Sequence, residues 1–467
     1  MRTEGDYNFS TGSRGRGNLS SVANPYFLFP QIYNFRYNIY SSEWPVANRA
    51  IELYLQKKSE NEGWERQING LSNNEKANLL LEKHTFKELL ADVEQRNLQN
   101  NIVGLEASRI FARSEINMGV DAFRDSLYAM LKRNTFLNIK FENMLDTLGQ
   151  MSRTDIYSSL KEWEQLTPLP FYSIGEPELT KVVNKGGEEF FVLKVLVSNN
   201  SDYDGIIQMN VLQNGWWYQP LEDPRARKKV EIAAHTTKEF VSVWEEQIRE
   251  VEVNTMISGN LPYMIRQSIG NVKQERNKIV KDSIYTLPES SLEMPGEIIV
   301  DNEDSTLFVL STPPVVGLLP KWLDEVEETP FKYSGISWWR APLQWTATTN
   351  AKYYGKYIRS AYVIKSGDGS QTATWKIPVP EAGQYELYYY VFKNDELRWN
   401  DRLQGEYHFR VAYDSEVEDA YINLRKANEG WEQLGTYYFS ADTVRVVLTD
   451  ECKLRSVTAD AVKIVKR

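Results

Sequence analysis

The chain has 467 residues, which at roughly 100–200 residues per domain indicates several domains. Its composition is 42% hydrophobic, 25% charged and 12% aromatic, which is typical of a globular protein and excludes a disordered or fibrous chain. With a net charge of −10 the chain has no excess of positive charge to bind a phosphate backbone, so we expect no nucleic-acid partner.

The first part of the sequence predicts a flexible arm at residues 1–24 and an all-helical subdomain at residues 25–166. The arm is rich in Gly, Ser, Asn and Arg and has no hydrophobic periodicity. It also lacks the apolar core of about 7–15 residues that a secretory signal needs, and no stretch of about 18 apolar residues follows anywhere in the chain.

Helix start signals and apolar residues at helical spacing define the helices of this subdomain. Ser42 and Pro45 precede the first apolar series, and Ser72 with Glu75 forms a capping-box pattern before the second. The expected helices cover 46–55, 72–81, 98–117, 121–131, 141–149 and 155–165.

Pro168 and Pro170 end the helical pattern, because proline disfavours the helical conformation of the residue before it. Short apolar and β-branched runs follow at 190–197, 206–212, 229–234, 239–244 and 249–257. Their spacing predicts an immunoglobulin-like β-sandwich over residues 167–261. Residues 262–296 are expected to form a connector with one helix over 262–276.

A second all-β domain is predicted over residues 297–467. Its expected strands are 297–301, 372–378, 384–392, 406–413, 434–439, 442–449 and 457–465. The fold class is therefore multi-domain α plus β, with a helical N-terminal subdomain, an Ig-like sandwich and a C-terminal jelly-roll-like sandwich.

Two charged runs look like solvated surface. The acidic run 414–419 lacks a glycine-containing ligand spacing for calcium and is predicted to be a turn or a sheet edge. The basic cluster Arg225, Arg227, Lys228 and Lys229 is predicted to be a solvated loop.

Within the helical part, the run from Gly104 to Gly119, followed by Asp121, Phe123, Trp163 and Leu169-Pro170-Phe171, resembles the end of the catalytic region of M1-family zinc aminopeptidases. The resemblance implies a helical tail followed by an Ig-like domain. It is closest to M1-like domains that some Bacteroidetes carry fused to an ABC-2 type permease, where stretches like Ile32–Tyr40 followed by Glu43-Trp44-Pro45 recur.

The zinc motif of that family is missing from this chain. M1 catalysis needs two histidines at i and i+4 on one helix face with a glutamate beside them. The three histidines are His84, His235 and His408, and none has another within five residues. We therefore expect no catalytic, cofactor-binding or metal-binding residue here, and zinc only if an upstream region carries the motif. The lone Cys452 makes neither a disulfide nor a multi-cysteine zinc site.

Six blocks of the C-terminal part look like the golvesin/xanthan-lyase carbohydrate-binding-like domain. They are 297–302, 372–380, 383–388, 407–411, 430–439 and 457–462. The resemblance implies a jelly-roll-like sandwich of the kind appended to secreted or surface enzymes, with sugar binding inferred for the family. Residues 303–371 are longer than is usual in it.

Sugar-binding modules lay aromatic faces against the apolar faces of sugar rings. The candidate ligand-binding residues are Trp338, Trp339, Trp345 and Trp399. Trp375 and Trp431 lie in strand motifs and are predicted to be core residues instead.

The leading hypothesis is a non-catalytic C-terminal portion of an M1 metallopeptidase-like protein that carries a module for carbohydrate or cell-surface binding. One alternative is a stand-alone extracytoplasmic glycan-binding or scaffold protein. Another is a fragment of a transport-associated zinc aminopeptidase whose active site lies upstream. The expected partners are a glycan or cell-surface polymer and a membrane-embedded parent region, in the periplasm or at the cell surface.

Overall fold

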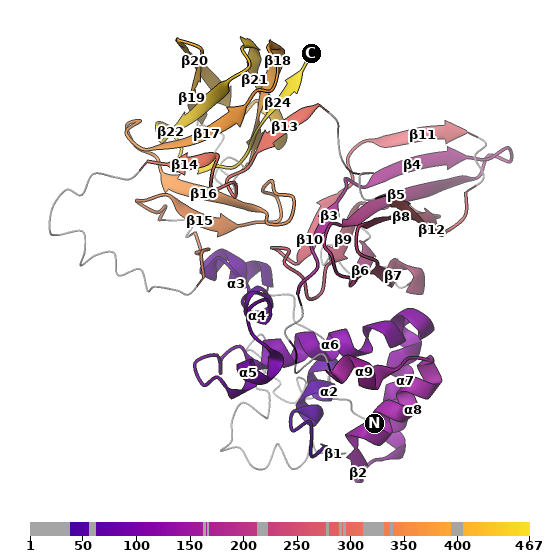
Figure 1. Cartoon of the computed structure of the whole chain (residues 1–467). Helices are drawn as coiled ribbons and strands as arrows, with labels where there is room; N and C mark the ends of the chain where they lie inside the picture. Colours follow the sequence, from indigo (N-terminus) through magenta and orange to yellow (C-terminus); the bar gives the residue numbers. More distant parts are fainter. Residues whose placement is uncertain are drawn as a thin grey trace. The chain divides into compact units, whose positions relative to one another are not determined.

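The computed structural model describes residues 38–55, 62–161, 165, 168–212, 223–276, 280–288, 292, 296–311, 331–336, 340–393 and 405–467. The chain separates into two compact units (Figure 1). Unit 1 comprises Met1–Glu60, Asn73–Gly259 and Tyr263–Ser291, and unit 2 comprises Asn61–Ser72, Asn260–Pro262 and Leu292–Arg467. Helices come first and mainly antiparallel strands follow, which confirms the mixed α and β class.

The helices predicted from apolar periodicity are confirmed in unit 1. They are α2 (Ala47–Leu55), α4 (Asn73–Leu81), α6 (Gln99–Met118), α7 (Val120–Arg133), α8 (Phe141–Ser152) and α9 (Ile156–Lys161). Helix α5 (Phe86–Ala91) was not predicted, although Thr85 and Glu88 form a capping box at its start. Strands β1 (Asn38–Tyr40) and β2 (Asn138–Lys140) pair in parallel.

Helix α6 is the centre of the helical part, where it packs against α2, α4, α5, α7, α8 and α9. Its Phe111 is buried between Tyr54 and Phe123, with ring centroids 4.9 and 5.4 Å away. This aromatic contact joins α2, α6 and α7. Among the helices that the structure describes, none has both the length and the apolar character needed to span a membrane.

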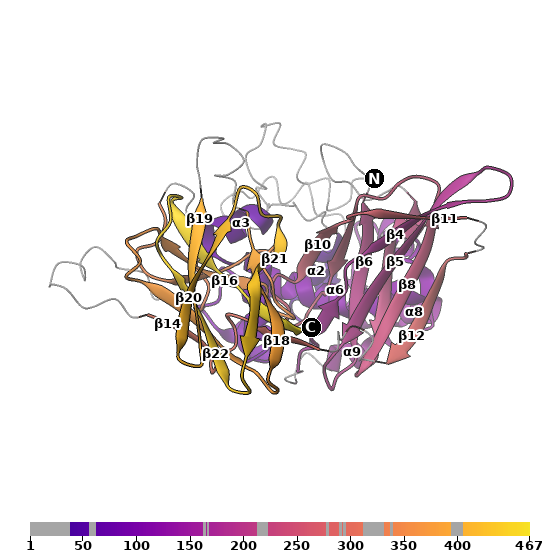
Figure 2. The same cartoon turned by 90° about the horizontal axis from the view of Figure 1, so that it is seen from above.

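Two β-sheets form the sandwich of unit 1. The four-stranded sheet has the order β10-β9-β6-β7, and the six-stranded sheet has the order β11-β4-β5-β8-β12 with β3 paired to β5 (Figure 2). The strands are β3 (Tyr172–Ile174), β4 (Glu178–Val183), β5 (Glu189–Asn199), β6 (Gly205–Leu212), β7 (Arg227–Ile232), β8 (Thr236–Trp244), β9 (Glu250–Asn254), β10 (Met264–Ser268), β11 (Val272–Arg276) and β12 (Ser283–Pro288). Their alternating apolar residues, such as Leu193 and Val195 of β5 and Ile207 and Met209 of β6, share one core.

The helix predicted over 262–276 is wrong, because this segment forms strands β10 and β11. Apolar residues such as Ile265, Ile269 and Val272 are interspersed with polar ones here, and each strand adds to the edge of a sheet. The polar composition suggested a connector because edge strands keep one face in solvent and therefore look hydrophilic.

Unit 2 is a second β-sandwich with one helix, α3 (Glu62–Asn69), placed beside it by a bond from the Thr349 hydroxyl to the Gly70 carbonyl at 2.7 Å. Its sheets have the orders β13-β24-β18-β21, β14-β17-β22-β19-β20 and β15-β16-β23. The strands are β13 (Glu297–Val300), β14 (Phe308–Leu310), β15 (Thr346–Thr349), β16 (Ser360–Lys365), β17 (Thr372–Pro378), β18 (Gly383–Val391), β19 (Glu406–Tyr413), β20 (Glu416–Asn423), β21 (Gly430–Phe439), β22 (Thr443–Thr449), β23 (Ser456–Ala459) and β24 (Val462–Lys466).

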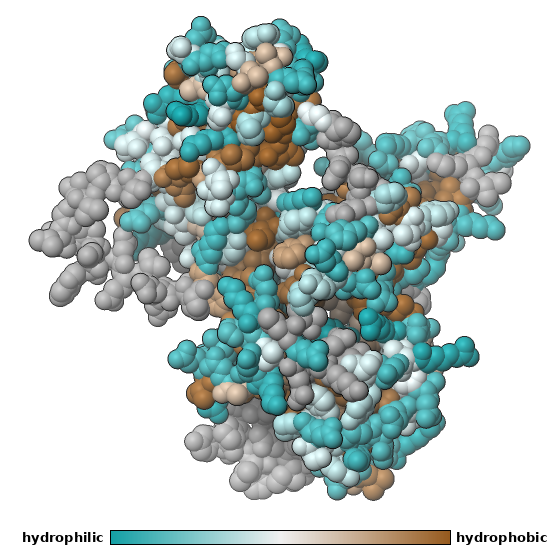
Figure 3. Space-filling model, viewed as in Figure 1, coloured by the Kyte–Doolittle hydropathy of each residue, from teal (hydrophilic) through white to brown (hydrophobic). Residues whose placement is uncertain are grey.

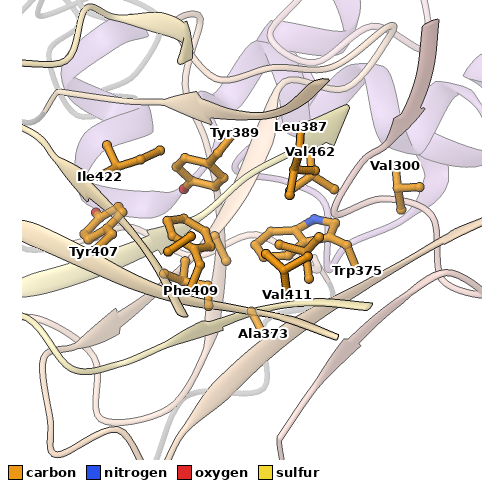
Figure 4. Packing of buried hydrophobic residues seen from close by; sticks show 14 of the residues in the cluster. Val300, Ala373, Trp375, Leu387, Tyr389, Tyr407, Phe409, Val411, Ile422 and Val462 are labelled. Carbon is orange, nitrogen blue, oxygen red and sulfur yellow. The ribbon is translucent and has the colours of Figure 1, made fainter. Parts of the chain in front are cut away.

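The core of unit 2 lies between the two larger sheets and is rich in aromatic side chains (Figure 4). Trp375 of β17 is fully buried, as predicted, and its indole N–H donates to the carbonyl of Asp460 at 3.2 Å. Tyr389 of β18 lies edge-on to this indole, with ring centroids 6.1 Å apart, and also contacts Phe409 of β19.

The strand predicted over 457–465 is two strands, β23 and β24, which belong to different sheets. β23 pairs with β16, whereas β24 pairs with β13 and β18. The change of sheet occurs at Asp460, whose carboxylate is buried and accepts the backbone N–H of Tyr354 at 3.2 Å. The acidic run 414–419 continues into β20, the edge strand of its sheet, in agreement with the predicted sheet edge.

Candidate functional site

The structure describes one of the four candidate tryptophans. Trp338, Trp339 and Trp399 lie outside the described residues. Trp345, just before β15, is half-buried against the core of unit 2. Its indole nitrogen is buried and makes no hydrogen bond within the described part of the chain. The role of these residues as ligand contacts therefore stays a prediction.

A different set of aromatic residues lies on the outer face of the sheet β13-β24-β18-β21. Along β18 the side chains alternate, so that Tyr385, Leu387 and Tyr389 are buried while Tyr388 and Tyr390 face outward. Tyr390 lies opposite Trp431 of β21, and directly opposite residues of an antiparallel pair share a face. Trp431, predicted as a core residue, is therefore a half-buried residue of the outer face.

Trp431 is the centre of an aromatic cluster with Tyr354 and Tyr390. The Trp431 centroid lies 5.0 Å from that of Tyr354 and 5.1 Å from that of Tyr390, and the Tyr390 pair is edge-to-face. Tyr354 and Tyr390 are themselves 5.5 Å apart. The three rings are packed on one another, so they hold a fixed arrangement where β18 ends and β21 begins. We call Tyr354, Tyr388, Tyr390, Trp431 and Lys463 the aromatic face.

Lys463 of β24 gives the aromatic face a positive charge. Its ammonium group lies 4.9 Å from the Trp431 centroid and 5.3 Å from that of Tyr388, which are cation–π distances. The same ammonium pairs with Glu297 of β13 at 2.8 Å. The lysine is thus held by two rings and one carboxylate. In Figure 3, apolar residues gather around β13 and β24, where Ile299 and Val465 belong to this outer face.

Hydrogen bonds also hold Glu386 and Arg467, the charged side chains next to Tyr388. The Tyr388 hydroxyl donates to Glu386 at 2.6 Å, and this bond raises the pKa of Tyr388. Arg467 donates to the other oxygen of Glu386 at 2.9 Å. Both bonds hold the pKa of Glu386 below its usual range, the tyrosine bond contributing most. Glu386 is therefore an anion with fixed partners.

Further along β21, Tyr438 lies opposite Gln384 and is 61% exposed, which makes it the open aromatic residue of the same face. Seven residues separate it from Trp431, about 24 Å at 3.4 Å per residue. Aromatic side chains thus mark both ends of the face. The alternation of Tyr388, Tyr389 and Tyr390 could have indicated it from the sequence, because the outer two must share a side.

Two of the three histidines contact carboxylate groups. His408 of β19 lies between Asp419 at 2.8 Å and Glu451 at 3.2 Å and stacks on Tyr421, whereas His235, in unit 1, contacts Asp202 at 2.8 Å. Within the described residues, no group of three or more His, Cys, Asp or Glu side chains could hold a metal ion.

Comparisons with known proteins identify the C-terminal part. Residues 339–466 match the Golvesin C-terminal domain. No curated protein sequence matches the chain. Among solved structures, a xanthan lyase from Paenibacillus is 16% identical, covers 64% of this chain and 27% of the lyase, and has a TM-score of 0.26.

Two further structures show similarly weak likenesses. The CBM35 from Cellvibrio japonicus Abf62 is 13% identical over 27% of this chain and 83% of its own, with a TM-score of 0.19. A Bacteroides uniformis beta-glucuronidase is 11% identical over 62% and 30%, with a TM-score of 0.18. These TM-scores support no conclusion about function. The match to residues 339–466 confirms the golvesin-like module expected at this end of the chain.

Proposed function

We propose that unit 2 is a glycan-binding module and that its aromatic face is the binding surface. The observation that carries this proposal is the cluster of Trp431, Tyr354 and Tyr390 on the outer face of a golvesin-like sandwich. Sugar rings present apolar C–H faces, and aromatic rings at a protein surface bind them while nearby polar groups bind the hydroxyls.

The polar groups suit this task because they are already oriented. Lys463 is held between Glu297 and two rings, and Glu386 is held by Tyr388 and Arg467. Side chains fixed before the ligand arrives lose little conformational entropy on binding. A polysaccharide lying along β21 would contact the cluster at one end and Tyr438 at the other.

Binding to a panel of neutral and acidic polysaccharides, measured with the full chain by affinity electrophoresis and calorimetry, tests this proposal. We expect Trp431→Ala to weaken binding by at least about tenfold, which corresponds to 1.4 kcal/mol. Tyr438→Ser should weaken it less. Trp64→Ala is the matched control, because Trp64 is a 63% exposed tryptophan on α3 of the same unit.

Circular dichroism of each variant separates lost binding from lost folding. Unchanged affinity of folded Trp431→Ala, or an equal loss in Trp64→Ala, would show that the aromatic face is not the binding surface. A chain that binds no member of the panel would contradict the glycan-binding function itself.

The proposal includes an extracytoplasmic location and a relation of the helical part to M1 aminopeptidases. The relation rests on the sequence resemblance of 104–119 and on the order of helices and sandwich in unit 1. The chain is then a non-catalytic binding portion of such a protein. Elemental analysis and an aminoacyl-anilide assay test this: stoichiometric zinc with peptide hydrolysis in the purified chain would refute it.

A further inference from the structure

The basic cluster that the sequence placed in a solvated loop lies beside a cavity in unit 1. Arg227, Lys228 and Lys229 belong to β7, the edge strand of the four-stranded sheet, and Arg225 lies just before it. All four side chains line a cavity of about 300 Å³. Pockets of this volume are at the lower end of those that take small ligands.

The cavity has more positive than negative charge. Only two acidic residues of the described chain, Glu115 and Asp282, line it with the four cations. Asp282 accepts from Arg225 at 3.2 Å, and Asp223 accepts from the same guanidinium at 2.7 Å. Arg225 is thus neutralised.

Both carboxylate oxygens of Glu115 also have partners. It pairs with the buried ammonium of Lys229 and accepts the hydroxyl of Tyr54 at 2.7 Å. Burial lowers the pKa of Lys229. Glu115 acts against this shift, whereas the nearby cations Arg124 and Arg227 lower the pKa further. The Nε atom of Arg124 is buried without a hydrogen-bond partner in the described structure. One carboxylate therefore faces several cations in a poorly solvated region.

Arg227 and Lys228 have no acidic partner among the described residues, in contrast to Arg225 and Lys229. Lys228 is exposed and faces the opposite side of β7, whereas Arg227 is half-buried on the side of Lys229. An unpaired cation at a half-buried position is costly unless an anion joins it, so Arg227 is the charge that an incoming ligand would meet.

The start of helix α7 adds a further preference for an anion. Gly119 and Val120 line the cavity, and Gly119 provides no side-chain cap for the first amides of this 14-residue helix. Uncapped amides at the start of a helix can donate to an anion.

The remaining wall of the cavity is apolar. It includes Ile116, Met209, Val211, Phe240 and Ile284. A small inorganic anion would leave this wall facing water, whereas an organic acid would cover it with hydrocarbon and gain about 25 cal/mol per Å² buried.

We propose that this cavity binds a small organic acid with an apolar body, its carboxylate between Arg227 and the start of α7 and its hydrocarbon against the apolar wall. The site lies in unit 1, so it is independent of glycan binding by unit 2.

Calorimetry of the full chain with octanoate, 1-octanol and inorganic phosphate tests the proposal. Octanoate should bind at least about tenfold more tightly than either other probe, because only it has both the charge and the hydrocarbon. Arg227→Met should lower the octanoate affinity at least about tenfold, or 1.4 kcal/mol. Arg276→Met is the matched control, since Arg276 is an exposed cation on β11 of the same unit.

A second variant, Ile116→Trp, fills the cavity and should abolish octanoate binding while leaving the charges in place. The proposal would be overturned if octanoate bound no more tightly than 1-octanol or no more tightly than phosphate. It would also be overturned if both folded variants bound octanoate as tightly as the unchanged chain does. The absence of octanoate binding to the unchanged chain would overturn it as well.

Discussion

The stability of unit 2 should depend on pH through two carboxyl groups, the half-buried Asp301 and the fully buried Asp460. Burial raises the pKa of Asp301 to about 8. Burial also raises the pKa of Asp460 well above its usual range, and the Asp301 carboxyl adds to this effect. Asp460 Oδ1 is buried with no hydrogen-bond partner among the described residues. Ionising Asp460 therefore places an unsolvated negative charge in the fold.

The sign and size follow from proton linkage. An aspartate of the unfolded chain has a pKa of about 3.9, so between about pH 4 and 8 the folded protein binds more protons than the unfolded one. The stabilisation is fully present below the unfolded pKa and is lost as the pH rises toward 8. Each pH unit in this window costs about 1.4 kcal/mol per group. Asp301 alone thus predicts a loss of about 3 kcal/mol between about pH 5 and 7.

Urea unfolding of the full chain at about pH 5, 6 and 7, followed by tryptophan fluorescence, measures this loss. Asp301→Asn and Asp460→Asn keep the shape of the side chain but cannot ionise, so each should flatten the pH dependence. Asp414→Asn is the control, because Asp414 lies in an exposed turn with a φ of 49° that asparagine also adopts. A stability that is flat or rises from pH 5 to 7, or equal slopes in all three variants, would refute the reasoning.

Two further substitutions test the packing. Trp375→Ala should destabilise unit 2 by about 3–5 kcal/mol in urea unfolding, because it empties the largest buried side chain of the core; a loss below about 1 kcal/mol would contradict this packing. Glu115→Gln should destabilise unit 1 by about 3–5 kcal/mol, because it leaves Lys229 buried without its carboxylate. Arg113→Gln, which breaks only the exposed pair with Glu231, should cost less than about 1 kcal/mol, and equal effects would argue against a buried pair.

Local sequence pattern was sufficient for a strongly amphipathic element such as α2, but it missed α5 and β16 although both bury side chains. The spacing of Ala50, Ile51, Tyr54 and Leu55 predicts α2, and all four side chains are buried. It was insufficient at the edges of sheets. β10 and β11 have one solvated face, and their pairing with β9 and β4 depends on residues far away in the chain.

The aromatic face was not located from the sequence, and the candidate residues Trp338, Trp339, Trp345 and Trp399 stay a prediction. Aromatic residues at the surface of a golvesin-like sandwich were expected, yet the cluster combines Tyr354, Tyr390, Trp431 and Lys463 from separate segments. The pairing of β18 with β21 and β24 brings Tyr390, Trp431 and Lys463 together, and Tyr354 joins them from the segment between β15 and β16. The strand motif around Trp431 resembled that of a core residue because strand residues of either face have the same local pattern.

The register of β18 connects the stability of unit 2 with its proposed function. Tyr385, Leu387 and Tyr389 point into the core while Tyr388 and Tyr390 point outward, so one strand supplies both the packing and the aromatic face. A slip of one residue would exchange the two sets. Such an exchange would bury Tyr388 together with the carboxylate of Glu386. The free energy lost by burying this charge exceeds what apolar packing would gain. The charged partners of the aromatic face thus also help to select the register that builds the core.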